Sequence, residues 1–355
     1  MLEELTRVAE RIGRLIVEDD FPETIRPEEL RRAVLDYPSR GGKRLRPALV
    51  VWSCGACGGD IEKSLYAAAA IEVFHNWTLV HDDIIDDDSM RRGQPTTHCR
   101  FASLYSEAAE GASVSPFIAG RNMAILCGDL QQAWANALLL KSHEAGVPSE
   151  VVLALSRRMQ EFANRDLITG EAIDTLMPLR DIATVTTEEA LEMYTLKTGV
   201  LLRFAVECGA LIAYGDNNFS RREVCALGEF ATAAGVAFQL RDDYLGIFGE
   251  EKSFGKALGS DLRSAKPTVL LVTALSRLQS PDREELLGLL RRAVYRDDDI
   301  AKAQGLIRKS GAEEAALQLE QEMCAKSRAA LSVLPESQYR GYLFDFIDYL
   351  ISRKK

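Results

Sequence analysis

Apolar residues recur along most of this chain at intervals of three and four positions, the spacing of one face of an α-helix. Ala, Leu, Glu and Arg, which all favour helix, fill the long segments between the breaks. Alternating apolar and polar runs bounded by turns, which would indicate half-buried strands, are almost absent. The pattern therefore predicts an all-α protein with roughly a dozen helices or more and little or no sheet.

Two helix starts are suggested by the spacing of a capping box, Thr186 with Glu189 and Ser220 with Glu223. The breaks, where Gly, Pro, Ser or Asn cluster, are short, and none is a long low-complexity linker. The residues that carry chemistry extend from about position 40 to about position 270, so any cut between them would divide one site. We therefore expect residues 1–355 to form a single helical domain.

The composition excludes several classes of protein. Hydrophobic residues make up 47% of the 355 positions, enough for a sizeable core. Lys and Arg total 43 against 53 Asp and Glu, a formal net charge of -10, which argues against nucleic-acid binding. No apolar run approaches the roughly 20 residues of a membrane helix. Because the acidic, amphipathic start does not resemble a signal peptide, we expect a cytoplasmic protein.

An aspartate cluster at residues 82–88, DDIIDDD, breaks the helical pattern. Asp82 and Asp86 would lie one turn apart on the same helix face, where like charges repel. Such a break in local rules often marks a functional site. Two carboxylates so placed suit Mg²⁺, which takes few protein ligands and completes its shell with water and phosphate oxygens. A solvated acidic helix end is the competing interpretation.

Cations accompany this cluster. Arg91 and Arg92 follow it directly and could clamp phosphate oxygens, which would offset the repulsion that an acidic protein exerts on an anionic substrate. Upstream, residues 41–47 read GGKRLRP, and Lys43 and Arg46 would project together if a helix begins here. A solvated helix start would have the same composition.

His75 lies seven residues before Asp82, two turns along the same helix face. A buried core histidine is the alternative interpretation. Far downstream, Asp242 and Asp243 end another long helical segment, and a loop with Lys256 and Lys266 follows. Two separated aspartate pairs, each followed by cations, indicate a divalent-metal and phosphate site more strongly than either pair alone.

Together these segments resemble the trans-prenyl diphosphate synthases, such as farnesyl and geranylgeranyl diphosphate synthases. The matching stretches, in order, are GGKRLRP (41–47), VFHNWTLVHDDIIDDDSMRRGQPTTH (73–98), AILCGDL (124–130), ITGEAID (168–174), LKTG (196–199), FQLRDDYLG (238–246) and the loop with GK and KPT (255–268). Residues 102–119 resemble an insertion relative to many members, and Gly246 stands where many have a third aspartate.

The resemblance implies helices packed around a deep central cavity, a homodimer, and two aspartate motifs that face each other across the cavity mouth. It implies that Asp82 and Asp86 bind two Mg²⁺ and that Asp242 binds a third. The positions that match contacts to the allylic diphosphate are Arg91, Lys197, Thr198, Gln239, Lys256 and Lys266. Those that match contacts to isopentenyl diphosphate are Lys43, Arg46, His75 and Arg92. Asp82, Asp86, Arg91, Lys197 and Asp242 would carry the catalysis.

The implied reaction joins isopentenyl diphosphate to an allylic diphosphate. In such synthases bulky residues just before the first aspartate motif block the growing tail. Trp77 lies about 7.5 Å along the helix axis from Asp82, with the smaller Thr78 beside it. We interpret Trp77 and Thr78 as the floor of the product cavity and expect a C20 product, with C15 as the next choice. The alternative is that Trp77 is merely core.

Two other functions share parts of this pattern. A class I terpene cyclase has a similar helical fold and aspartate site, but it binds one diphosphate and has no use for GGKRLRP and His75. A non-catalytic partner subunit of a synthase could lose its aspartates, whereas both motifs are intact here.

Overall fold

A computed structural model describes residues 1–108, 113–249, 260–292, 294 and 296–352. The prediction of an all-α fold is confirmed, since the strands of this described part are limited to one hairpin with two residues per strand. By their contacts the residues fall into two units. One comprises Met1–Glu161, Phe204–Cys225 and Leu334–Leu343, and the other Phe162–Arg203, Ala226–Val333 and Phe344–Lys355. That residues 1–355 form one domain stays a prediction.

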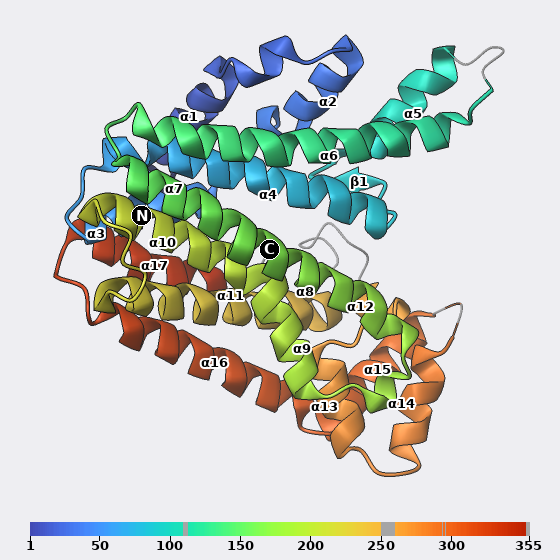
Figure 1. Cartoon of the computed structure of the whole chain (residues 1–355). Helices are drawn as coiled ribbons and strands as arrows, with labels where there is room; N and C mark the ends of the chain where they lie inside the picture. Colours follow the sequence, from blue (N-terminus) through green and yellow to red (C-terminus); the bar gives the residue numbers. More distant parts are fainter. Residues whose placement is uncertain (109–112, 250–259, 293, 295, 353–355) are drawn as a thin grey trace. The chain divides into compact units, whose positions relative to one another are not determined.

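The first unit contains most of the N-terminal half of the chain (Figure 1). Its elements are α1 (Leu2–Glu18), η1 (Phe21–Thr24), α2 (Glu28–Ser39), α3 (Leu45–Ala56), η2 (Ile61–Ser64), α4 (Leu65–Ile85), β1 (Met90–Arg91), β2 (Gln94–Pro95), α5 (Thr97–Ala108), α6 (Pro116–Leu140), η3 (Lys141–His143) and α7 (Ser149–Arg158). Elements with residues in both units are η4 (Met159–Asn164), α10 (Val200–Tyr214), α11 (Arg222–Phe248) and α17 (Gln338–Ile351).

The second unit contains the remaining helices. These are α8 (Arg165–Leu176), η5 (Met177–Leu179), η6 (Ile182–Thr184), α9 (Thr187–Tyr194), η7 (Thr195–Gly199), α12 (Ser260–Arg263), α13 (Val269–Arg277), α14 (Asp282–Leu290), α15 (Asp297–Lys309) and α16 (Ala312–Leu331). Leucines of α13, α14 and α15 form much of one apolar core in this unit. Within the described residues, no helix combines the length and apolarity that a membrane crossing needs.

Helix α4 carries the first aspartate motif and packs beside α6 in the first unit (Figure 1). Its apolar residues are buried nearly all round, as expected of a helix that is hydrophobic on every face. Gly128 of α6 permits the close approach, because a Cβ there would lie 2.1 Å from Nε2 of His81. The same ring nitrogen lies 3.2 Å from the carbonyl oxygen of Ile125. These contacts fix the last turns of α4.

The short hairpin follows α4 and pairs Met90 with Pro95 and Arg91 with Gln94. Its two turn residues, Arg92 and Gly93, have φ values of 54° and 75°. Positive φ at both central positions is what a type I′ hairpin turn requires, and Gly93 adopts it without steric cost. The turn thereby brings Arg91 back toward the end of α4.

In the second unit, α8 lies against the π-helical segment η7. Gly170 makes this approach possible, since a Cβ there would lie 2.5 Å from the backbone nitrogen of Lys197. Helix α9 begins with the predicted capping box: the Glu189 N–H donates to the Thr186 hydroxyl at 3.2 Å, and the Thr186 N–H donates to the Glu189 carboxylate at 2.8 Å.

The second predicted capping box is wrong. Helix α11 begins at Arg222, two residues beyond Ser220. Ser220 lies in the preceding turn, where its backbone N–H donates to Oδ1 of Asn218 at 3.1 Å. The asparagine side chain therefore organises this turn, and the serine is too early to cap the helix.

Candidate active site

The first aspartate motif lies where α4 ends. Asp86 follows the helix directly, and its backbone N–H donates to the carbonyl oxygen of Asp82 at 2.8 Å. The two residues are thus one turn apart, as the sequence predicts. The Asp82 side chain is 20% exposed and Asp86 is exposed, so solvent reaches both side chains.

Asp83, between them, is buried and has a different environment. Its carboxylate accepts hydrogen bonds from the Tyr37 hydroxyl and, at 2.5 Å, from Nε of Arg91. Burial raises the pKa of Asp83, and the hydrogen bonds from Arg91 and Tyr37 oppose that shift. Burial and Asp83 in turn raise the pKa of Tyr37, so the hydroxyl keeps its proton and donates it to the carboxylate.

The side chains of Arg91 and Arg92, both in the hairpin, bind two different partners. Nη2 of Arg91 lies 3.2 Å from Oδ2 of Asp82, so this guanidinium contacts both Asp82 and Asp83. Nη1 of Arg92 donates to the carbonyl oxygen of Gly41 at 2.6 Å. The hairpin therefore joins the aspartate motif to the GGKRLRP segment through adjacent arginines.

The expectation that one helix aligns Lys43 with Arg46 is wrong. Helix α3 begins at Leu45, and the residue before it, Arg44, has a left-handed backbone with φ 48°. Lys43 therefore precedes the helix and is exposed. The Arg44 side chain is buried and donates to the carbonyl oxygens of Ala9 at 2.7 Å and Pro38 at 3.1 Å.

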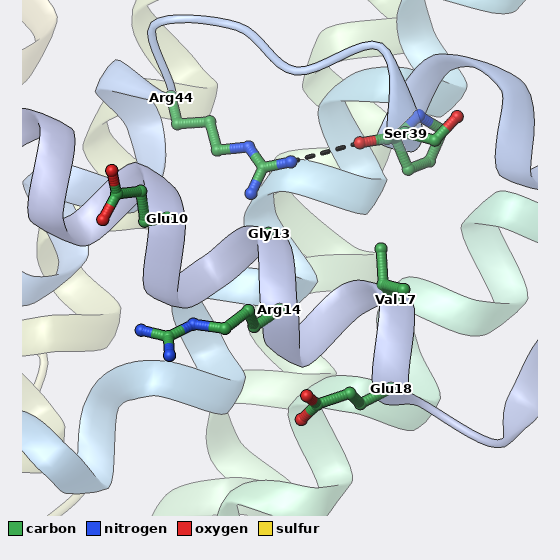
Figure 2. Close-up of a pocket in the computed structure, with 8 residues that line it drawn as sticks. Glu10, Gly13, Arg14, Val17, Glu18, Ser39 and Arg44 are labelled. Atoms are coloured by element: carbon green, nitrogen blue, oxygen red, sulfur yellow. Dashed lines mark hydrogen bonds between the residues drawn. The ribbon is translucent and has the colours of Figure 1, made fainter.

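Figure 2 shows Arg44 reaching between α1 and the end of α2, at the edge of an open pocket. Gly13 makes room for the guanidinium, because a Cβ there would lie 2.6 Å from Nη1 of Arg44. The pocket is lined by Glu10, Gly13, Arg14, Val17, Glu18, Pro38, Ser39 and Arg44. None of these is a predicted site residue, and Arg44 acts here as a link between α1 and α2.

Arg46 and His75, two residues of the predicted isopentenyl diphosphate subsite, contact each other. Nη1 of Arg46 lies 3.1 Å from Nε2 of His75. Burial and the nearby Arg46, Arg92 and Arg91 hold the pKa of His75 well below 6.5, so its ring is neutral. Because arginine can only donate, Nε2 accepts and Nδ1 carries the proton, 3.4 Å from the Thr78 hydroxyl.

Glu72 is a member of this cluster that the sequence analysis missed. It is only 4% exposed, and Oε1 lies 3.9 Å from Nε of Arg44. Burial raises the pKa of Glu72, while Arg44 and Arg46 oppose the shift. Burial also lowers the pKa of Arg46 to about 10, a shift that Glu72 opposes and Arg92 supports. A lone acid in an otherwise apolar helical run was the available signal.

Trp77 is buried in the first unit, with 6% of its surface exposed. Its ring packs edge-on against Phe74, with centroids 4.8 Å apart, and against His81 at 6.0 Å. The Thr78 hydroxyl donates to the carbonyl oxygen of His75 at 2.8 Å. Thr78 therefore supports His75, and the assignment of Trp77 and Thr78 to a cavity floor stays a prediction.

Lys197 and Lys266 meet at Asp174 in the second unit. The two ammonium groups lie 2.6 and 3.0 Å from Oδ2 of Asp174, and Lys197 also lies 2.8 Å from Glu171. Burial raises the pKa of Asp174, but Lys266 and Lys197 outweigh it, so the net shift is downward. Asp174 and Glu171 were not predicted as site residues, although both belong to the ITGEAID stretch.

The second aspartate motif has a hydrogen-bond network of its own. The Thr198 hydroxyl donates to Oε1 of Gln239 at 3.3 Å, and Nε2 of Gln239 donates to Oδ1 of Asp243 at 3.1 Å. The Tyr194 hydroxyl donates to the other oxygen of Asp243. Asp243 is 4% exposed, whereas Asp242 is half-buried.

Further predictions concern residues that accompany this motif. Gly246 is buried within α11, one turn after Asp242. Lys256 lies outside the described residues. The structure thus brings together Lys197 and Lys266, and separately Thr198 and Gln239, within the second unit. That the two motifs face each other across a cavity mouth stays a prediction.

The carboxylates of Asp82 and Asp86 offer the oxygen ligands that Mg²⁺ prefers. Within the described residues, no group of three or more His, Cys, Asp or Glu side chains is close enough to form an all-protein metal cage. Mg²⁺ is ordinarily held by one or two carboxylates, with waters and substrate phosphates completing its shell. Asp82 and Asp86, accessible and one turn apart, fit that requirement.

Comparisons with known proteins agree with this chemistry. The family model described as polyprenyl synthetase matches residues 27–307. A short chain isoprenyl diphosphate synthase of Methanothermobacter thermautotrophicus is 32% identical over 330 residues, covering 93% of this chain and 92% of the relative. The geranylgeranyl pyrophosphate synthetase structure of Pyrococcus horikoshii has a TM-score of 0.84 at 32% identity and covers 99% of both chains.

A third similar protein was solved with ligands. The geranylgeranyl pyrophosphate synthase of Corynebacterium glutamicum, complexed with isoprenyl diphosphate and magnesium, has a TM-score of 0.85 at 28% identity, with 99% of both chains covered. The chain described here therefore belongs to the polyprenyl synthetase family and is a prenyltransferase.

Proposed function

We propose that this enzyme condenses isopentenyl diphosphate head-to-tail with an allylic diphosphate and gives a short all-trans prenyl diphosphate. The preferred product in this proposal is geranylgeranyl diphosphate (C20), with farnesyl diphosphate (C15) second. The observation that carries the proposal is the end of α4, where Asp82 and Asp86 are accessible and Arg91 is fixed beside them by Asp83.

Asp82, Asp86 and Asp242 would hold the divalent cations, three Mg²⁺ in this proposal. When bound, the metal neutralises negative charge on the leaving diphosphate. Asp86 is exposed and the Asp82 side chain keeps 20% of its surface exposed, while the buried Asp83 binds Arg91. The similar Corynebacterium glutamicum enzyme was solved with magnesium, which supports the choice of metal.

Lys43, Arg46, His75 and Arg92 would bind isopentenyl diphosphate. Arg46 and His75 are already in contact, and Arg92 reaches the backbone of the same segment at Gly41. The neutral His75 accepts from Arg46 and so orients the guanidinium, which supplies the positive charge. These residues would hold the diphosphate end fixed while the double bond reacts.

The allylic diphosphate would be bound by Arg91 and by a further set of side chains. That set is Lys197, Thr198, Gln239, Lys256 and Lys266. Asp174 holds Lys197 and Lys266 at 2.6 and 3.0 Å, so both ammonium groups are placed before substrate arrives. Fixed cations of this kind stabilise charge that develops on a leaving group.

The chemical step breaks the bond between C1 of the allylic substrate and its diphosphate oxygen. The double bond of isopentenyl diphosphate then attacks C1 and forms the new carbon–carbon bond. The proton lost from C2 passes to an oxygen of the released pyrophosphate. In this scheme Arg91, Lys197 and Lys266 stabilise the departing oxygens, and no protein base takes part.

A homodimer is part of the same proposal. Helix α6 exposes Phe117, Ile118, Ile125 and Leu126 by 46%, 50%, 41% and 51%, and α5 exposes Leu104 by 49%. Ile118 and Ile125 are seven residues apart and lie nearly in line on α6, with Phe117 and Leu126 to either side of them. An exposed apolar strip of this size on two neighbouring helices suits contact with a second copy.

The decisive experiment supplies purified protein with Mg²⁺, radiolabelled isopentenyl diphosphate and one primer at a time: dimethylallyl, geranyl or farnesyl diphosphate. We expect incorporation that ends at C20. Asp82→Asn should lower kcat by at least about a hundredfold, because metal stabilisation of the leaving group is worth several kcal/mol. Asp87→Asn is the matched control, since this exposed neighbour has a left-handed φ of 54° that asparagine tolerates.

The outcomes separate the candidates. A stop at C15 keeps the synthase and moves the floor, and Trp77→Ala should lengthen the products if Trp77 forms that floor. Pyrophosphate release from a primer alone, without incorporation, would indicate a terpene cyclase. The Arg46–His75 contact argues against that outcome, since a cyclase binds one diphosphate. Neither incorporation nor pyrophosphate release with any primer would indicate a non-catalytic partner subunit.

A further inference from the structure

The two units contain the same buried arrangement at their aspartate pairs. Tyr37 of α2 donates its hydroxyl to Asp83, and Tyr194, the last residue of α9, donates its hydroxyl to Asp243. Exposure of these four side chains is 4% or less. In each pair the first aspartate is accessible or half-buried, and only the second meets the tyrosine.

Each tyrosine is also held by the start of a helix. The Tyr37 hydroxyl accepts the backbone N–H of Thr97, the first residue of α5, at 3.4 Å. The Tyr194 hydroxyl accepts the backbone N–H of Val269, the first residue of α13, at 2.9 Å. Because a helix cannot satisfy its first N–H groups internally, each hydroxyl is fixed on both sides.

Each second aspartate then fixes a side chain that matches a contact to the allylic diphosphate. Asp83 accepts from Nε of Arg91 at 2.5 Å, and Asp243 accepts from Nε2 of Gln239 at 3.1 Å. Both chains of contacts therefore run from a helix start, through a tyrosine and an aspartate, to a substrate-binding group. Neither chain includes Arg46 or His75.

We propose that Tyr37 and Tyr194 are positioning residues for the allylic diphosphate subsite and that they leave the isopentenyl diphosphate subsite unaffected. The inference rests on the proposed function. Neither hydroxyl contacts substrate in this scheme: each acts through Asp83 or Asp243 on the orientation of Arg91 or Gln239.

The test compares Tyr37→Phe, Tyr194→Phe and a control, Tyr244→Phe. Tyr244 also donates to a carboxylate, Glu313, at 3.3 Å, and it follows Asp243 directly on α11. Each variant removes one hydroxyl and keeps the ring. KM values for both substrates are measured, and the dissociation constant of the allylic diphosphate with Mg²⁺ is measured by calorimetry without isopentenyl diphosphate.

We expect each site variant to raise KM and the dissociation constant for the allylic diphosphate about tenfold, the loss typical of a hydrogen bond to a charged group. KM for isopentenyl diphosphate should stay within about twofold, and the control should match the wild type. Equal changes in both KM values, unchanged affinities, or loss of folding in both site variants would overturn the inference. A wild type that does not condense the substrates would instead overturn the proposed function.

Discussion

Neighbouring residues of one chemical type have different roles in this protein, because their side chains reach different partners. Arg44 is buried and donates to the backbone of α1 and α2, while Arg46, two positions later, contacts His75. Asp83 is buried against Tyr37 and Arg91, while the side chain of Asp82 keeps 20% of its surface exposed. Residue type alone would have assigned one role to each pair.

The neutral state of His75 makes a prediction about stability and pH. Its pKa lies well below 6.5 in the folded protein, so the unfolded chain binds this proton more readily. The contribution of neutral His75 to the free energy of unfolding is therefore fully present above about pH 6.5 and declines as the pH falls below it. Between about pH 7.5 and 5.5, wild type should lose on the order of 1 kcal/mol more unfolding free energy than His75→Gln.

Urea denaturation at several pH values measures this difference. His143→Gln, in the short element η3 and not assigned to either proposed subsite, is the control and should follow the wild-type curve. Parallel curves for wild type and His75→Gln would contradict the prediction.

At the scale of elements, the second unit depends on the close approach of α8 and η7. A Cβ on Gly170 would lie 2.5 Å from the backbone nitrogen of Lys197, a separation that no side-chain movement can relieve. The same approach lets Lys197 reach Asp174 at 2.6 Å. The glycine therefore links packing to the placement of a substrate-binding cation.

Gly170→Ala should lower the free energy of unfolding by about 1–3 kcal/mol, the usual cost of forcing an extra methyl group into a packed contact. Gly288→Ala is the matched control, because this helical glycine of α14 has nothing within 4 Å of the added Cβ. The control should gain about 0.5–1 kcal/mol. Chemical denaturation measures both values, and equal stabilisation by both alanines would contradict the account.

The sequence predicted many of the helices, but it did not predict features that depend on contacts between residues far apart in the chain. Apolar periodicity predicted the helical segment that becomes α4, and the Thr186 capping box is confirmed. The buried position of Arg44 was not predictable, because its side chain is held by a hydrogen bond to Ala9, far upstream. The role of Asp174 was missed for the same reason: Lys197 and Lys266 are distant in sequence.

At the scale of the whole molecule, the exposed apolar residues of α5 and α6 form the face at which we propose that two copies meet. Leu126 is 51% exposed on that face, and Leu153 of α7 is 64% exposed outside it. The two leucines allow a matched comparison, since a charge at either position costs the single chain little.

Sedimentation velocity should show a dimer for the wild type and for Leu153→Glu. Leu126→Glu should shift the population toward monomer, because it would bury a charge in an apolar contact. A monomeric wild type, or the same behaviour for both variants, would contradict the proposed interface.

The π-helical turn at Thr195–Gly199 restricts insertions and deletions in this part of the chain. A π turn holds one residue more than an α turn, so losing any one residue could restore a regular α-helix without breaking it. The two flanking helical parts would keep nearly the same relative rotation, because the wide turn absorbs the extra residue, but the residues within the turn would point in new directions. Lys197 and Thr198 would lose their directions while the hydrophobic composition stayed nearly the same. Over these five residues, alignment gaps between relatives should therefore be rarer than substitutions.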